Sequence, residues 1–158
     1  SKPEIPTDVI LIDRTISTCP NVTHHSMGCL SERVIQYFGS NSDNPNLSSY
    51  NPHLPLINEN NLIELLFEEN AKSCSLPDIG IDGAIVTSQD RLEETVQEYS
   101  GRTKGYAGVS RPAYSNDGHA LVYATYFCGS LCGVGWMLYL ECNADGWQII
   151  IARELWIS

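Results

Sequence analysis

The spacing of hydrophobic residues changes from helical to alternating near Gly105. Beyond it, segments rich in Val, Tyr, Thr, Phe and Trp are separated by turn sequences, a pattern that indicates β-strands. Two of these turns, Asn116-Asp117-Gly118 and Asn143-Ala144-Asp145-Gly146, are typical of hairpins. We therefore expect an antiparallel β-meander of four or more strands in the C-terminal third, at about 106–114, 120–128, 132–142 and 147–151, with 156 as the alternative end of the fourth strand.

Before Gly105, apolar residues recur three and four positions apart, which predicts helices at 30–38, 59–70 and 89–99. Short apolar runs at 8–13 and 83–86 predict two further strands. Residues 39–55 are rich in Ser, Asn and Pro and are expected to form a long polar loop. The pattern as a whole predicts an α+β fold in which the meander packs against two or three helices.

The length of 158 residues fits one domain, and no internal repeat divides the chain. We therefore expect a single domain over 1–158, with an acidic helix- and loop-rich part at 1–100 and the β-meander at 101–158. No run of 18 apolar residues is present, so no transmembrane helix is expected.

The net charge of −10 belongs to the first 100 residues. They contain five Lys or Arg and fifteen Asp or Glu, whereas residues 101–158 contain four of each kind. Nucleic acid and anionic membranes are disfavoured as partners, because both require clustered Lys and Arg. An acidic surface suits a basic protein, since opposite potentials speed the encounter. Simple solubility would explain the same charge.

Six cysteines, at positions 19, 29, 74, 128, 132 and 142, permit three disulfides. Two pairs lie close in the sequence and are the candidate local disulfides, Cys19 with Cys29 and Cys128 with Cys132. Cys74 would then pair with Cys142 or both would stay free. The set slightly favours a periplasmic or secreted location over the cytoplasm. Reduced, buried thiols in a cytoplasmic protein would also fit.

The sequence contains no recognisable catalytic or metal-binding signature. A redox pair usually has two intervening residues at a helix N-terminus, whereas Cys128 and Cys132 enclose three residues in a β-turn. A zinc site would need two more ligands, and His119 and Cys142 do not form a second paired motif. We therefore expect a protein that is not an enzyme and carries no cofactor or metal.

Aromatic residues are dense in the predicted meander. Core packing explains most of such a set, and an exposed aromatic patch for a partner is the alternative. The residues concerned are Tyr123, Tyr126, Phe127, Trp136, Tyr139, Trp147 and Trp156.

Several short motifs of the C-terminal third recur together in other proteins. They are Gly105 to Tyr114, Ala120-Leu121-Val122-Tyr123, Cys128-Gly129-Ser130-Leu131-Cys132-Gly133, Gly146-Trp147 and Trp156-Ile157-Ser158. With these motifs the chain resembles a widespread group of bacterial proteins of uncharacterised function. The resemblance is close over 105–158 and looser upstream. It implies a shared fold with a cysteine hairpin, and it implies no activity.

These observations favour a non-enzymatic acidic binding protein, in concrete form an inhibitor or immunity protein that neutralises a basic toxin such as a nuclease. The alternative is a disulfide-stabilised periplasmic or secreted domain with a structural or ligand-binding role. Contacts with a basic partner are expected on the acidic helices and the polar loop. The candidate residues are Asp43, Glu64, Glu68, Glu69, Asp90, Glu93, Glu94 and Glu98.

Overall fold

The computed structural model describes residues 9–19, 29–31, 57, 60–76, 83–101, 103, 105–129 and 131–158. These residues contain seven β-strands, two α-helices and one 3-10 turn. In chain order the elements are β1 (Val9–Ile12), α3 (Leu62–Glu69), β2 (Ala84–Thr87), η1 (Gln89–Arg91), α4 (Leu92–Glu98), β3 (Tyr106–Val109), β4 (Ala113–Tyr114), β5 (His119–Gly129), β6 (Cys132–Asn143) and β7 (Gly146–Ile157).

All seven strands belong to one open, mixed sheet in the order β2-β1-β3-β5-β6-β7, with β4 paired to β5. The strands β5, β6 and β7 are consecutive antiparallel neighbours, as the turn sequences predicted. The strands of the C-terminal third are antiparallel as predicted, but the sheet as a whole is mixed, because β1 is parallel to both β2 and β3. The crossover through η1 and α4 carries the chain from β2 past β1 to β3, and a connection of this kind makes strands parallel.

The predicted strand at 106–114 is divided into β3 and β4. Pro112 has no N–H to give to a ladder, so the strand is interrupted where the sequence placed the proline. Between the two halves, the backbone N–H of Arg111 donates to Asn70 Oδ1 at 2.8 Å. Asn70 directly follows α3 and is fully buried, so the interruption is also where the helix is tied to the sheet.

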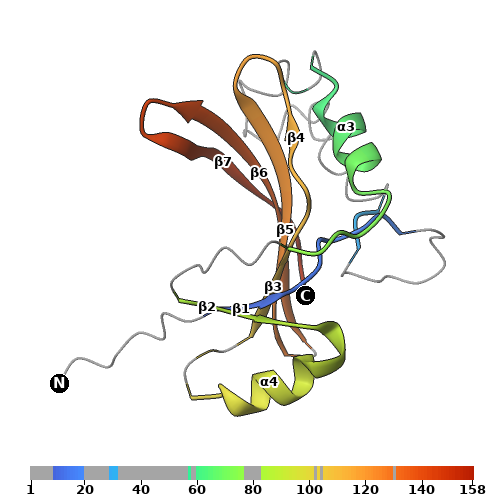
Figure 1. Ribbon diagram of the computed structural model, residues 1–158, viewed down its shortest axis with the longest axis vertical. Coiled ribbons are helices and arrows are strands. Elements are labelled where there is room, and N and C mark those ends of the chain that lie inside the picture. The colour runs from blue at the N-terminus through green and yellow to red at the C-terminus, as the bar shows by residue number, and fades with distance from the viewer. Residues whose placement is uncertain are drawn as a thin grey trace.

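The core lies between α3 and one face of the long strands. Leu62 and Leu66 of α3 are fully buried in a cluster with Leu121, Tyr123 and Tyr139 of β5 and β6. Complete burial of a leucine side chain contributes about 1.5–3 kcal/mol, so the two leucines are a main source of the attachment. Figure 1 shows α3 beside β4 and the upper part of β5, and α4 at the opposite end of the sheet near β1 and β2.

Both described helices fall within predicted ranges and are shorter than predicted. The helix expected at 59–70 is Leu62–Glu69, and the one expected at 89–99 is η1 followed by α4. The polar loop predicted at 39–55 and nearly all of the helix predicted at 30–38 lie outside the described residues.

Candidate functional site

The carboxylates of η1 and α4 form one exposed group. Asp90, Glu93, Glu94 and Glu98 are all exposed, and we call them the α4 acidic surface. The only cation within 89–98 is Arg91, whose Nε lies 3.5 Å from Glu94 Oε2. This pair is well exposed, with side chains 67% and 70% accessible, so it contributes little to stability.

The orientation of α4 follows from its buried side. Leu92 and Thr95 are the buried residues of the helix. The Thr95 hydroxyl donates to the Arg91 carbonyl at 2.8 Å and accepts from the Thr87 hydroxyl of β2, also at 2.8 Å. Because Leu92 and Thr95 form the buried side of the helix, the acidic residues occupy its exposed positions.

The carboxylates of α3 are also exposed but are more nearly balanced by cations. Glu64, Glu68 and Glu69 lie on this helix, and Glu69 Oε2 is 3.2 Å from Arg111 Nη2. Lys72 follows within the next turn and is exposed. The last predicted contact residue, Asp43, lies outside the described residues.

The structure therefore separates the predicted contact residues into two groups. Figure 1 shows α3 and α4 at opposite ends of the sheet, so one flat interface does not include both helices. The four residues of the α4 acidic surface are brought together, and the three glutamates of α3 lie apart from them. Sequence spacing could not reveal this, because it fixes positions along each helix and not the place of the helix on the sheet.

Both pairs of neighbouring cysteines are joined by disulfides. Cys19 is bonded to Cys29 and Cys128 to Cys132, with Cα–Cα distances of 5.4 and 5.1 Å. The second bridge closes the tip between β5 and β6. Cys74 and Cys142 are free thiols.

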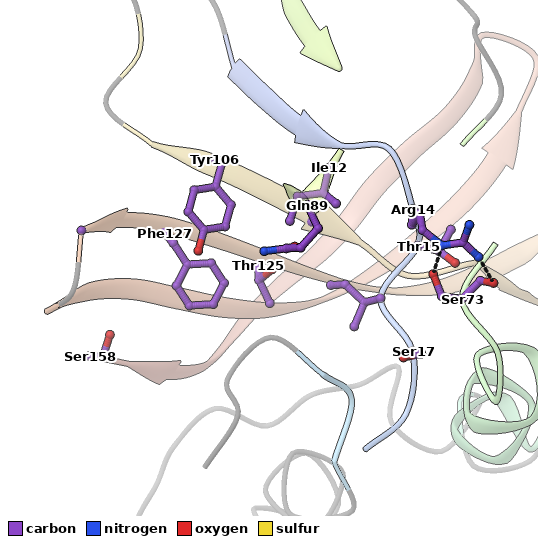
Figure 2. Close-up of a pocket in the computed structure, with 13 residues that line it drawn as sticks. Ile12, Arg14, Thr15, Ser17, Ser73, Gln89, Tyr106, Thr125, Phe127 and Ser158 are labelled. Carbon is purple, nitrogen blue, oxygen red and sulfur yellow. Dashed lines mark hydrogen bonds between the residues drawn. The ribbon is translucent and has the colours of Figure 1, made fainter. Parts of the chain in front are cut away.

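A cleft that the sequence did not predict lies along the sheet face that carries the ends of β1, β3 and β5. Its volume is about 540 Å³, and it is lined from distant segments of the chain. Arg14, Ser17 and Ser73 lie at one end in Figure 2, and Tyr106 and Phe127 lie at the other. A volume in this range is typical of a site for a small molecule.

The aromatic end of the cleft is held in place by its neighbours. The rings of Tyr106 and Phe127 are stacked with centroids 5.3 Å apart, and the ring of Trp156 lies 5.7 Å from Phe127 on the other side. Trp156 Nε1 donates to the hydroxyl of Tyr123 at 2.8 Å. Tyr123 is fully buried, and this burial raises the pKa of its hydroxyl. A partly buried hydrogen bond therefore holds the row of rings in place.

Two glycines of β6 make room for these rings. A Cβ on Gly135 would lie 2.1 Å from Trp156 Nε1, and one on Gly133 would lie 3.1 Å from Phe127 Cδ1. Glycine inside a strand often marks such a close approach, so the sequence Gly133-Val134-Gly135 was a signal for this end of the cleft.

A serine, an aspartate and a histidine meet at the turn between β4 and β5. The Ser115 hydroxyl donates to the Asp117 carboxylate, and His119 Nδ1 lies 2.9 Å from the same oxygen. The hydrogen bond from Ser115, and to a lesser extent the one from His119, lowers the pKa of Asp117 below its ordinary value of 3.8. A hydrolase triad needs the histidine to accept from the serine, whereas here the serine bonds the aspartate and the backbone of His119. The arrangement stabilises the turn.

Within the described part of the chain, no group of three or more His, Cys, Asp or Glu side chains is placed to hold a metal ion. In the same residues, no helix is long and apolar enough to cross a membrane. Comparison with protein-family models, curated proteins and solved structures finds no match to this chain. Function is therefore inferred from its residues and their geometry.

Proposed function

We propose that this chain is a non-enzymatic binding protein that engages a basic protein through the α4 acidic surface. The observation that carries the proposal is the concentration of Asp90, Glu93, Glu94 and Glu98 on one exposed helical segment with a single arginine. The α3 carboxylates are a weaker candidate, because Glu69 is paired with Arg111.

Asp90, Glu93 and Glu94 lie in first turns, where the helix dipole favours anions, whereas the position of Glu98 disfavours the helix. Glu94 and Glu98 are four residues apart, and like charges at this spacing destabilise a helix by about 0.2–0.5 kcal/mol. Glu98 lies in the last turn, where the helix dipole disfavours an anion and no basic residue is present. Glu98 therefore weakens its own helix, and an external partner of opposite charge explains its position better than folding does.

The concrete form of the proposal is an inhibitor or immunity protein that neutralises a basic toxin, such as a nuclease. A nuclease needs a cationic surface to bind phosphates, and an acidic protein can cover that surface. Charge complementarity of this kind mainly raises the association rate and selects the partner.

The test is to purify the proteins encoded beside the gene for this chain and to measure their association with it by stopped-flow mixing. The proposal predicts that the association rate constant falls at least about tenfold between about 50 mM and about 500 mM NaCl, because salt screens exposed charges. A rate constant that is unchanged over this range would contradict it, as would neighbouring gene products that do not bind.

A second candidate function is supported by the two disulfides. A disulfide-stabilised periplasmic or secreted domain, with a structural or ligand-binding role, would keep both bridges in an oxidising compartment. Titration of protein purified in its native state and denatured without reductant should then give two reactive thiols, from Cys74 and Cys142. Six reactive thiols would contradict this candidate.

A further inference from the structure

The cleft on the sheet differs in charge from the rest of the protein. The chain has a net charge of −10, yet none of the described residues that line the cleft is Asp or Glu. Arg14 is the only charged side chain among them. A positively charged site in an acidic protein attracts anions and disfavours cations, so the basic protein proposed above is not suited to this cleft.

Arg14 is exposed and is oriented by two hydrogen bonds to neutral groups. Its Nε donates to the Ser73 hydroxyl at 3.1 Å, and its Nη2 donates to the Ser73 carbonyl at 3.0 Å. Arg91 and Arg111 each have a carboxylate within 4 Å, whereas no described carboxylate pairs with Arg14. A guanidinium that is oriented but not neutralised is suited to hydrogen bond a carboxylate.

The opposite end of the cleft is apolar and planar. Tyr106 and Phe127 present stacked rings there, and Ile12 and Ile16 contribute aliphatic surface elsewhere in the cleft. Gly108 of β3 leaves space in the cleft, because a Cβ at this position would lie 3.2 Å from Ile16 Cγ1 and from Thr125 Oγ1. Aromatic side chains favour a flat apolar group that can stack or meet them edge to face.

Two polar groups lie between these ends. Figure 2 shows the side chain of Gln89 over the middle of the cleft, with Thr125 below it. Neither side chain forms a hydrogen bond with another described residue. Gln89 is exposed and available to a ligand, whereas Thr125 is 3% exposed and lines the interior of the cleft. A few placed polar groups in an otherwise apolar cleft are the usual means of orienting a small molecule.

We propose that this cleft binds a small organic monoanion, a carboxylate with an apolar ring, with its carboxylate at Arg14 and its ring against Tyr106 and Phe127. The volume of about 540 Å³ lies within the range of small-molecule sites. One guanidinium matches a single carboxylate, whereas polyanions such as nucleotides are bound by several donors or cations. The inference is independent of the partner proposed for the α4 acidic surface.

The test is an NMR titration of the isotopically labelled protein with phenylacetate. Phenylacetamide, which has the same ring without the charge, and acetate, which has the charge without the ring, are the matched probes. The proposal predicts saturable shifts of the Gly108, Thr125 and Phe127 amides with phenylacetate, and binding at least about tenfold weaker for each matched probe. Absence of these shifts, or equal affinity for phenylacetate and phenylacetamide, would overturn it.

Variants test the role of Arg14. Arg14→Gln should weaken phenylacetate binding at least about tenfold, since a charge-assisted hydrogen bond is lost. Arg14→Lys keeps the charge and should retain the preference for phenylacetate over phenylacetamide. Arg91→Gln removes an exposed arginine outside the cleft and should bind like the unaltered protein. Equal binding by Arg14→Gln and Arg91→Gln, with native spectra for both, would overturn the proposal.

Discussion

Asn70 and Arg111 are joined by two hydrogen bonds, although they are 41 residues apart in the chain. The side-chain amide of Asn70 donates to the Arg111 carbonyl at 3.1 Å, and its Oδ1 accepts from the Arg111 N–H at 2.8 Å. The same amide donates to the Leu66 carbonyl at 2.7 Å. One fully buried side chain thus connects the end of α3 to the gap between β3 and β4.

Replacing Asn70 by Ala should destabilise the protein strongly. The substitution leaves the N–H and carbonyl of Arg111 without these partners in a partly buried site, and each such loss costs about 1–3 kcal/mol. We expect a decrease of about 2–4 kcal/mol in the free energy of unfolding, measured by urea denaturation. Glu68→Ala, an exposed change on the same helix, should stay within about 0.5 kcal/mol of the unaltered protein. Equal stability of the two variants would show that Asn70 does not hold α3 to the sheet.

The aromatic row depends on the absence of a side chain at Gly135. In Gly135→Ala, the new Cβ would overlap the Trp156 ring, so either the ring or the strand must shift. We expect a loss of about 1–3 kcal/mol of stability and a change in tryptophan fluorescence. Gly101→Ala, where a Cβ meets nothing within 4 Å, is the matched control. Unchanged fluorescence and stability in Gly135→Ala would contradict this packing.

The turn between β4 and β5 should make stability sensitive to acid. Because the pKa of Asp117 is lowered in the folded protein below 3.8, its ionised form favours folding. This contribution is complete above about pH 5 and is lost as the pH falls through 3.8 towards the folded pKa. Thermal unfolding of Asp117→Asn should therefore show a smaller decrease in Tm between about pH 5 and about pH 3 than the unaltered protein. An equally steep decrease would mean that Asp117 is not stabilised in the turn.

A charge change at the end of α4 should separate stability from binding. In Glu98→Lys, a cation replaces an anion in the last helical turn and stands four residues after Glu94. Both effects favour the helix, and we expect stability to rise by about 0.5 kcal/mol. If the α4 acidic surface meets a basic partner, the same variant should bind that partner more weakly. Tm and the Kd for the partner are the two measurements, and parallel gains in both would contradict the proposed surface.

Local features of the sequence predict much of the fold. The turns at Gly118 and Gly146, both with positive φ, and the alternating residues between them define β5 to β7. The described helices are also predictable from apolar spacing. The position of β1 between β2 and β3 is not, because Ile10 pairs with both Ile85 and Tyr106, and local periodicity identifies a strand without identifying its neighbours.

The two candidate sites also differ in how far the sequence could predict them. The α4 acidic surface lies within one segment, so its residues could be named from the sequence. The cleft draws Arg14, Gln89 and Phe127 from three distant segments, and only the strand order brings them to one place. The glycines at 133 and 135 indicate that a side chain approaches the strand closely, but they do not indicate which side chain it is.

The most direct test of the account compares two pairs of charge reversals for binding to the basic partner. The double variant Glu93→Lys, Glu98→Lys alters the α4 acidic surface, and Glu64→Lys, Glu68→Lys alters α3. Each double variant raises the net charge from −10 to −6, so long-range attraction changes equally. We predict that the α4 variant raises the Kd measured by calorimetry at least about tenfold and that the α3 variant changes it less than about twofold. Equal effects of the two variants, or a larger effect of the α3 variant, would contradict the assignment of the binding surface to α4.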